Sequence, residues 1–216
     1  MAMRFTIGFL RQMWAGLLVL LALTAVLGVL YPAVVWGVGR MGSDSAEGSP
    51  VHDTNGCPVG SALVGVDPVA PADGPDPFFH ARTPGSVADA DPFAPGDPAA
   101  ALPTNQGPSS EVLAEFVEAR RTAIAEREGV SPYDVPVDAV TGSGSGIDPD
   151  ISPAYAAIQV PRVAAATGLG ESRVRELVTE HTEGRQLGFL GEERVNVLEL
   201  NVALGLTAPD CGTAGG

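Results

Sequence analysis

Residues 12–39 read QMWAGLLVLLALTAVLGVLYPAVVWGVG, a run of 28 residues without a formal charge between Arg11 and Arg40. As a helix rising about 1.5 Å per residue, this run reaches roughly 42 Å, more than the ~30 Å hydrocarbon core of a bilayer. Trp14 and Trp36 lie near its two ends, where amphipathic rings favour the membrane interfaces. A cleaved signal peptide has a shorter apolar core, about 7–15 residues. The sequence therefore predicts a retained transmembrane helix over residues 12–39.

The charges on either side of this run indicate its orientation. Arg4 and Arg11 precede it, and Arg40 alone follows it closely. The first acidic residue is Asp44, and the nine arginines and 26 acidic residues after position 40 give that part a net charge of −17. Because cytoplasmic flanks of membrane helices are enriched in basic residues, the sequence predicts a cytoplasmic N-terminus (residues 1–11) and an extracytoplasmic main domain.

The composition excludes several function classes. All 12 basic residues are arginines, so a Walker A phosphate loop and a catalytic lysine are absent. A net charge of −14 without a basic patch does not suit nucleic-acid binding. The three histidines have no metal-ligand spacing, so no metal site is predicted.

The chain has two cysteines, Cys57 and Cys211. Two are too few for a zinc ribbon or an iron–sulfur site, and their separation rules out a CxxC redox pair. In an oxidising compartment they form a candidate disulfide between the membrane-proximal segment and the C-terminus. The alternative is two free thiols, and the sequence leaves both open.

The segment after the span is rich in proline. Residues 50–108 hold 12 of the 19 prolines, a density that excludes long helices and disfavours central strands. We interpret residues 40–108 as an extended part of the outer domain, with a short strand near Ser61–Val66. We expect part of this segment, roughly Ala70 to Pro98, to be poorly ordered.

Regular structure is expected to return in residues 109–206. Ser109 or Ser110 can begin a helix that runs to about Glu128 and ends at Gly129. The apolar run Val135–Val140 is typical of a short strand.

A second group of elements follows. Ser152 can begin a helical stretch that Pro161 interrupts, giving two short helices or one kinked helix before Gly168. Glu171–His181 is amphipathic and predicts a further helix. The run from Val195 fits either a strand or a short helix. These patterns predict an α+β domain behind one transmembrane helix, with a flexible tail over residues 207–216.

Few residues carry chemistry. The string TGSGSG at residues 141–146 resembles a phosphate cradle, but it matches neither GxxxxGK[ST] nor GxGxxG, so a glycine turn with positive φ is the simpler interpretation. A Ser143, Asp148 and His181 triad has no supporting motif, and no catalytic residue is predicted. Asn196 and Asn201 lie in an apolar run, where an inward amide must be hydrogen-bonded.

Two long strings give a resemblance to a known family. DAVTGSGSGIDPDISPAYAAIQVPRVA (residues 138–164) and LVTEHTEGRQLGFLGEERVNVLELNVAL (residues 177–204) are similar to strings of the C subunit of the bacterial potassium-transporting Kdp ATPase. GSALVG at residues 60–65 resembles its GSxLIG segment, and the single N-terminal span also matches that family.

The middle of the chain departs from the family pattern. FFHARTPGS begins at Phe78 where the family has YFHxRPS, and TNQGPSSE begins at Thr104 where it has SNLGPSNP. Asp150 stands where histidine is usual, and Glu193 stands where proline is usual. These departures affect the middle loops more than the assignment.

The resemblance implies a non-catalytic accessory subunit of a high-affinity, ATP-driven potassium uptake complex. Its implied partners are a channel-like potassium-binding subunit, a P-type ATPase subunit and a very small membrane subunit. The family is described as needed for assembly and as a catalytic chaperone that raises the nucleotide affinity of the ATPase subunit. ATP and potassium are thus expected through the complex, with Ser143, Gly144, Gly146 and Gln159 as candidate coupling or nucleotide-contact residues.

Two alternatives stay open at this stage. A membrane-tethered exported enzyme or binding module acting alone would need a paired nucleophile and base or a metal cluster, and the sequence shows neither. A domain that faces the cytoplasm and contacts ATP directly conflicts with the orientation that the charges predict.

Overall fold

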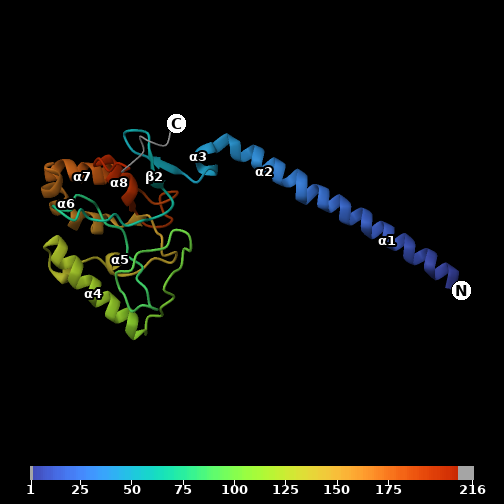
Figure 1. Ribbon diagram of the computed structural model, residues 1–216, viewed down its shortest axis with the longest axis horizontal. Coiled ribbons are helices and arrows are strands. Elements are labelled where there is room, and N and C mark those ends of the chain that lie inside the picture. Colours follow the sequence, from blue (N-terminus) through green and yellow to red (C-terminus); the bar gives the residue numbers. More distant parts are fainter. Residues whose placement is uncertain (1, 209–216) are drawn as a thin grey trace. The chain divides into compact units, whose positions relative to one another are not determined.

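The computed structural model describes residues 2–208, and the side chains of residues 7–208. Contacts group the chain into two units, a helical unit that ends at Ser49 and a mixed unit that begins at Pro50. The helical unit consists of consecutive helices, and the mixed unit combines helices with short strands (Figure 1). This confirms the predicted α+β class with one long apolar N-terminal helix. The finer boundaries predicted at residues 39, 108 and 206 stay predictions.

The helical unit follows the apolar run. Helix α1 (Ala2–Ala25) continues through one π-helical turn (Val26–Leu30) into α2 (Tyr31–Gly39). A 3₁₀ turn (Arg40–Gly42) and the short α3 (Ser43–Ala46) follow. The π-helical turn ends two residues before Pro32 and contains Gly28, whose carbonyl the proline ring would meet in an ordinary α-helix. A wider turn accommodates the ring without breaking the helix.

The apolar side chains of the helical unit are not covered by this chain. Residues 7–46 meet the length and hydropathy expected of a membrane span: within them, a stretch of 18 residues has a mean hydropathy of 2.5, and none of that stretch is buried. At its end the Arg40 guanidinium lies 5.1 Å from the Trp36 ring centre and 2.7 Å from a Glu47 carboxylate oxygen. A continuous apolar surface of this size needs lipid or other protein around it.

A small hairpin opens the mixed unit. Strand β1 (Pro50–His52) pairs antiparallel with β2 (Pro58–Ser61). The strand expected at Ser61–Val66 is therefore wrong, because the chain turns at Ser61. The Ser61 hydroxyl accepts from the Leu63 amide (3.1 Å), and the Ser61 carbonyl accepts from the Val64 amide (3.2 Å).

Helix α4 (Glu111–Glu128) has the predicted ends. The Ser110 hydroxyl accepts from the Leu113 amide at 3.2 Å, and Gly129 closes the helix with a φ of +66°. Both ends are specified by local capping, which the sequence displays.

The strand predicted at Val135–Val140 is wrong. A 3₁₀ turn (Pro132–Asp134) leads into the one-turn helix α5 (Val137–Val140). Pro136 precedes this helix with a φ of −62°, and the neighbours Ala139 and Val140 are both buried. A strand would place two consecutive side chains on opposite faces, so apolar composition alone misidentified the element.

The remaining helices follow. Helix α6 (Pro153–Thr167) is one helix that contains Pro161, with the Ser152 side chain at its start and Gly168 at its end. Helix α7 (Glu171–Glu180) buries Val174, Leu177 and Val178 as the amphipathic pattern predicts. The C-terminal run gives a short strand followed by helix α8 (Val197–Ala203).

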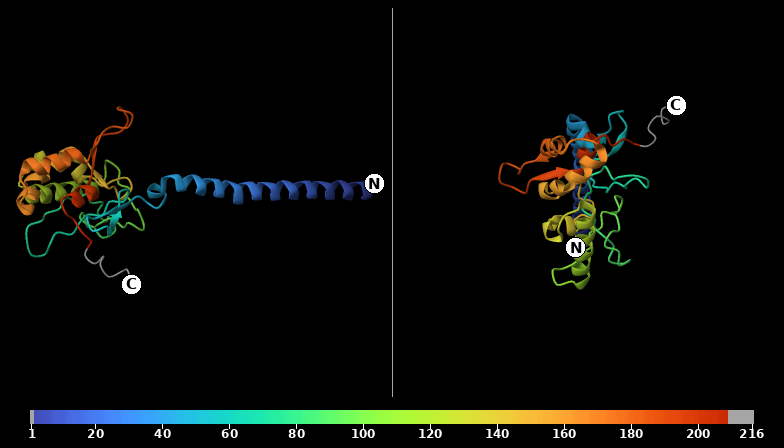
Figure 2. Two further views of the ribbon diagram at one scale, coloured as in Figure 1. Left: turned by 90° about the horizontal axis from the view of Figure 1, so that it is seen from above. Right: turned by 90° about the vertical axis from the view of Figure 1, so that its left-hand side faces the viewer.

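A three-stranded antiparallel sheet joins these parts in the order β3 (Asp150–Ile151), β5 (Arg194–Asn196), β4 (Thr182–Glu183). The chain between β4 and β5 projects from the helices as a long loop (Figure 2). We call residues 182–194 the arm.

One core holds the mixed unit together. Helices α4 and α5, α6 and α7, and α7 and α8 pack against one another. The largest apolar side chains with at most 2 % exposure are Phe79, Val140, Ile151, Tyr155, Val160, Val163, Val174, Val195 and Leu200. Phe79 is the member of this set that comes from the proline-rich segment, which therefore packs into the core.

Candidate functional site

The glycine loop of residues 141–146 is a tight turn. Gly146 has a φ of +77°, and a Cβ there would lie 2.7 Å from the Leu102 carbonyl oxygen. The Ser143 hydroxyl accepts from the Gly146 amide at 2.8 Å and so closes the turn from within. Gly144, by contrast, is exposed, with open space where a Cβ would be. The positive φ expected of this loop is confirmed at Gly146.

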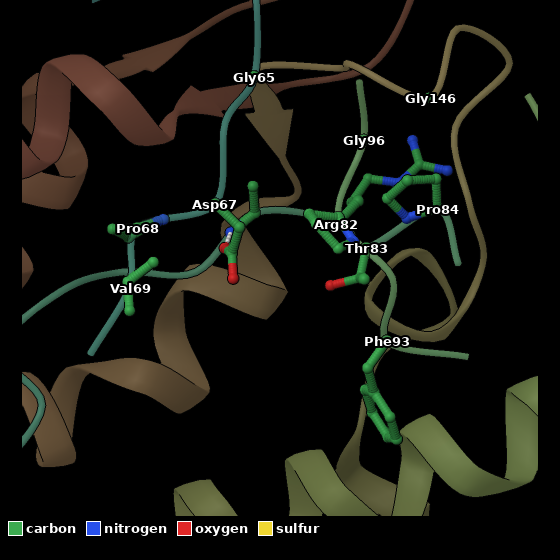
Figure 3. A pocket seen from close by; sticks show the side chains of 12 residues that line it. Gly65, Asp67, Pro68, Val69, Arg82, Thr83, Pro84, Phe93, Gly96 and Gly146 are labelled. Atoms are coloured by element: carbon green, nitrogen blue, oxygen red, sulfur yellow. Dashed lines mark hydrogen bonds between the residues drawn. The ribbon is translucent and has the colours of Figure 1, made fainter. Parts of the chain in front are cut away.

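A cavity of about 150 Å³ lies beside this loop, lined by Gly65, Asp67, Arg82, Thr83 and Gly146 among others (Figure 3). The backbone is crowded here, since a Cβ at Gly65 would lie 2.1 Å from the Asp148 carbonyl oxygen. The Arg82 guanidinium bonds to the Gly142 carbonyl and to the Asp148 carboxylate, both at 2.9 Å. The Arg82 side chain in the cavity wall thus attaches the glycine loop.

Ser143, Asp148 and His181 do not form a catalytic triad, because each bonds to a different partner. Asp148 pairs with Arg82, while His181 Nδ1 lies 2.8 Å from the Leu177 carbonyl oxygen at the end of α7. Ser143 serves the glycine turn. A wider groove of about 430 Å³ holds Asp138, Asp148, Asp150, Glu192 and Glu193 together with Arg82 and Arg194. Within residues 2–208, no group of three His, Cys, Asp or Glu side chains is arranged to hold a metal ion.

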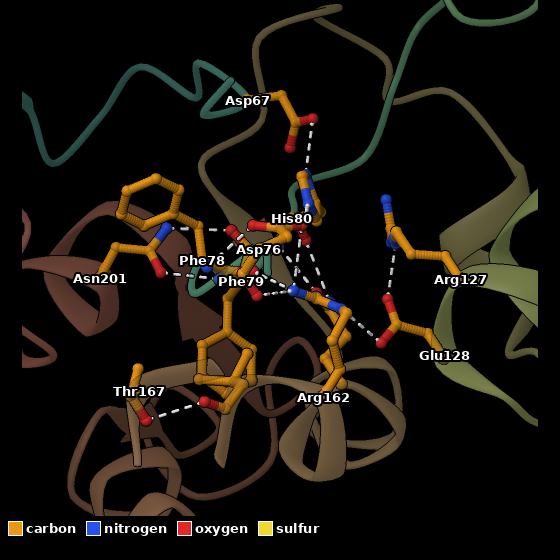
Figure 4. Close-up of polar contacts among 12 residues, drawn as sticks. Asp67, Asp76, Phe78, Phe79, His80, Arg127, Glu128, Arg162, Thr167 and Asn201 are labelled. Carbon is orange, nitrogen blue, oxygen red and sulfur yellow. Dashed lines mark hydrogen bonds and ion pairs between the residues drawn. The ribbon is translucent and has the colours of Figure 1, made fainter. Parts of the chain in front are cut away.

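A buried polar cluster fixes the proline-rich segment, and we call it the His80 cluster (Figure 4). The His80 ring lies between two carboxylates, with Nδ1 2.9 Å from Asp67 and Nε2 2.6 Å from Asp76. Arg162 on α6 pairs with Asp76 (3.1 Å) and with Glu128 on α4 (2.9 Å). The cluster therefore connects two helices and a segment that lacks regular structure.

Two amides complete the attachment of this segment. The Gln159 side chain accepts from the His80 amide (2.7 Å) and donates to the His80 carbonyl (3.2 Å). The Asn201 side chain likewise accepts from the Phe79 amide (2.8 Å) and donates to the Phe79 carbonyl (2.9 Å). The poor order expected for residues 70–98 is therefore wrong at Phe79–Ala81, which are buried. The hydrogen bonding expected of an inward Asn201 is confirmed.

Asn196 also satisfies its expected hydrogen bonds. Its side-chain oxygen accepts from the Glu199 amide at 3.1 Å and caps α8, and its amide nitrogen donates to the Ala62 carbonyl at 2.9 Å. The short strand and the following helix are thus joined at one residue, and the helical cap explains why alternation does not continue past it.

The charges of the His80 cluster change the acidity of Asp76. Burial alone raises the pKa of this carboxyl, but hydrogen bonds from His80 and the Phe78 amide, with the charges of His80 and Arg162, outweigh it. The pKa of Asp76 therefore lies below its ordinary value. Gln159, one of the candidate coupling residues, has no exposed surface and bonds to His80 and Arg162 inside this cluster.

Cys57 lies beside the last described residue. The Asp53 carboxylate accepts from the Cys57 amide (2.9 Å) and from the Ala208 amide (3.0 Å). Cys211 lies outside the described residues, three positions after Ala208. Three residues of extended chain reach about 10 Å. The Cys57–Cys211 disulfide stays a prediction.

The matches to known proteins agree with one another. The family model described as KdpC, the c chain of the K⁺-transporting ATPase, matches residues 13–205. The chain belongs to the KdpC family. The potassium-transporting ATPase KdpC subunit of Kineococcus radiotolerans is 50 % identical over 200 residues, which is 93 % of this chain and 96 % of that protein.

Two other relatives carry the same description. The KdpC subunit of Streptomyces avermitilis is 42 % identical over 90 % of this chain and 93 % of its own length. That of Ralstonia nicotianae is also 42 % identical, over 92 % of this chain and 91 % of its own length. The resemblance expected from the sequence is confirmed, and the chain is a membrane-associated subunit of a potassium-transporting ATPase with one candidate N-terminal transmembrane helix.

Within this KdpC subunit, the sequence did not reveal the His80 cluster or the arm. The string FFHARTPGS, which begins at Phe78 and differs from the family string, contains His80 and Arg82. Their partners on other elements lie 59 to 79 positions further along the chain, on α6 (Gln159) and after α5 (Thr141, Gly142 and Asp148), so no local pattern identifies them. The nearer partners of His80, Asp67 and Asp76, lie 13 and 4 positions before it in a segment without regular structure.

Proposed function

We propose that this KdpC subunit supports its complex by assembly and not by chemistry of its own, with its mixed unit outside the cytoplasm. Its partners in this proposal are a channel-like potassium-binding subunit, a P-type ATPase subunit and a very small membrane subunit. In this role it acts as a catalytic chaperone that raises the ATP affinity of the ATPase subunit.

The observation that carries the proposal is the uncovered apolar helix. Large side chains along it, such as Leu18, Leu27 and Trp36, are 61 to 65 % exposed within this chain. Lipid accommodates such a surface, and neighbouring helices can pack on it. The polar side chains of the His80 cluster, in contrast, bond to other groups of the mixed unit and fix its proline-rich segment.

The charge distribution supports an indirect effect on ATP. The net charge of −17 follows the span, so the mixed unit lies outside if basic flanks stay inside. ATP is then on the other side of the membrane from Ser143, Gly144, Gly146 and Gln159. We therefore infer that these residues affect nucleotide affinity through the assembled complex, and that the acidic mixed unit attracts cations within about 10 Å of its surface.

Co-purification tests this proposal. Extracting membranes in mild detergent through an affinity tag on this chain is expected to recover the two large Kdp subunits with potassium-stimulated ATP hydrolysis. The chain alone is expected to hydrolyse no ATP. A phosphatase reporter that folds only outside the cytoplasm, fused after Gly216, is expected to be active. Purification of the chain without partners, ATP hydrolysis by the chain alone, or an inactive reporter would each contradict the proposal.

We also propose that Cys57 and Cys211 are joined outside the cytoplasm. Oxidised protein is expected to migrate faster than reduced protein on a denaturing gel, because a closed loop of this size makes the unfolded chain more compact. The shift is expected to vanish in Cys57→Ser. Equal mobility of the oxidised and reduced wild type would show two free thiols.

A further inference from the structure

The arm is a defined structure that leaves the helices of the mixed unit and returns to them. Its base is the antiparallel pair of β4 and β5, with Thr182 opposite Val195 and Glu183 opposite Arg194. Near its end, Gln186 and Leu190 exchange two backbone hydrogen bonds of 2.9 Å each. The arm therefore presents residues 187–189 at a fixed turn.

Ion pairs and glycines hold this turn in shape. Arg185 pairs with Glu192 at 2.6 Å across the arm, and Arg194 pairs with Glu183 at the base. Leu187 has a φ of +54°, which bulky residues rarely adopt, and Gly188 follows with +81°. The backbone thus holds Leu187 in an unfavourable conformation that places its side chain outside the fold.

The side chains at the end of the arm are apolar. Leu187 is 83 % exposed, Phe189 is 69 % exposed and Leu190 is 48 % exposed. They do not contribute to the core of the mixed unit, so folding of this chain does not explain their character. Three apolar side chains within four residues on a projecting turn have the form of an anchor that fills a pocket on a partner.

The charges along the arm indicate a protein pocket and not a lipid surface. Arg185 and Arg194 are each neutralised by a glutamate of the arm. Glu193 lies next to Arg194 at the base of the arm and forms no ion pair with the side chains of residues 7–208, so the arm carries an open negative charge below its apolar tip. Negative charge disfavours approach to anionic lipid headgroups but complements a basic rim on a protein.

We propose that the tip of the arm, Leu187, Phe189 and Leu190, docks into an apolar pocket with a basic rim on another subunit of the potassium-transporting complex. This rests on the proposed function, because it assumes that the chain assembles with such subunits. The arm then supplies a contact outside the transmembrane helix and fixes the mixed unit on its partner.

Site-specific photocrosslinking in the intact complex tests the proposal. A photoreactive phenylalanine analogue at position 189 is expected to form an adduct with a Kdp subunit, identified by mass spectrometry. The matched control carries the analogue at Tyr133, which is 95 % exposed on a different element and is expected to form at least ten-fold less of that adduct. An adduct with lipid alone, or none, from position 189 in an assembled complex would overturn the docking proposal and leave the proposed function intact.

Substitution gives a second readout. Leu187→Ser with Phe189→Ser is expected to reduce recovery of the partner subunits at least ten-fold at increased detergent, while Tyr133→Ser leaves recovery unchanged. The thermal unfolding midpoint of the chain should not fall in either variant, since these side chains are exposed. Unchanged recovery in the double variant contradicts the docking proposal. If the wild-type chain recovers no partner, the proposed function itself fails.

Discussion

Replacing Arg120 by methionine is expected to lower the free energy of unfolding of the mixed unit by about 3 kcal/mol or more. Arg120 is 2 % exposed, and its guanidinium donates to three backbone carbonyls, those of Pro84 (2.7 Å), Pro92 (2.8 Å) and Val140 (3.1 Å). Methionine fills much of the volume but donates nothing. Each buried carbonyl left without a donor costs about 1–3 kcal/mol.

The stability lost in Arg120→Met is not that of a broken ion pair. Burial lowers the pKa of Arg120 below its ordinary value, and no carboxylate pairs with it among the described ion pairs. Its charge is instead balanced by carbonyl dipoles and by the Phe116 ring, whose centre lies 5.4 Å from the guanidinium carbon. The effect is therefore expected to persist in high salt, which weakens exposed ion pairs.

Arg121→Met is the matched control, one position further along α4. Arg121 makes one exposed hydrogen bond, to the Pro132 carbonyl at 3.1 Å, so its loss is expected to cost less than about 0.5 kcal/mol. Urea denaturation of the full chain in mild detergent, followed by circular dichroism, measures both. Equal effects of the two substitutions would show that Arg120 does not secure the proline-rich segment.

The sequence predicted those elements whose ends are specified locally. Ser110, Gly129, Ser152 and Gly168 begin or end helices where the capping rules place them, because a cap involves residues within one turn. The apolar helix was predictable for the same reason, since its length and composition are sufficient. The strand expected at residues 135–140 failed because a six-residue apolar run does not distinguish a strand from a helical turn.

The proline-rich segment was not predictable, and its chemistry explains why. Proline offers no N–H and removes the option of sheet pairing, so this segment needs hydrogen-bond donors from elsewhere. Side chains on α4, α6 and α8 supply them, as Arg120, Arg162 and Asn201 show. These contacts join residues from 28 to 122 positions apart, so they leave no periodic signal.

The exclusive use of arginine as the basic residue suits this architecture. A guanidinium offers five N–H donors in a fixed plane, so one side chain can serve several carbonyls at once, whereas an ammonium is a compact charge with three donors. Arg82, Arg120 and Arg162 each bond to at least two backbone carbonyls. These arginines therefore supply hydrogen-bond donors to backbone carbonyls, as the N–H groups of a neighbouring strand do in a sheet.

Arg162→Met is expected to destabilise the mixed unit by about 3 kcal/mol or more at pH 7, because it takes one cationic partner from each of two buried carboxylates and a donor from two backbone carbonyls. The substitution removes a partner from Glu128, whose side chain has no exposed surface, and from Asp76. It also removes the donor for the carbonyls of Asp76 and Phe78. Arg173→Met is the matched control, since Arg173 forms an exposed pair with Glu176 on α7 and should contribute less than about 1 kcal/mol.

The pH dependence separates the charge effect of Arg162 from simple loss of packing. The pKa of Asp76 is lower in the folded chain than in the unfolded chain, so its contribution to stability is present above the unfolded pKa of about 4 and is lost as the pH falls. Without Arg162, the folded state holds the Asp76 charge less favourably. Protonation of Asp76 below about pH 4 therefore removes less stability from the variant than from the wild type. The difference in free energy of unfolding between the wild type and Arg162→Met, measured by urea denaturation, is expected to be smaller at pH 3.5 than at pH 7. A deficit that is equal at both pH values would assign the role of Arg162 to packing and carbonyl bonding alone.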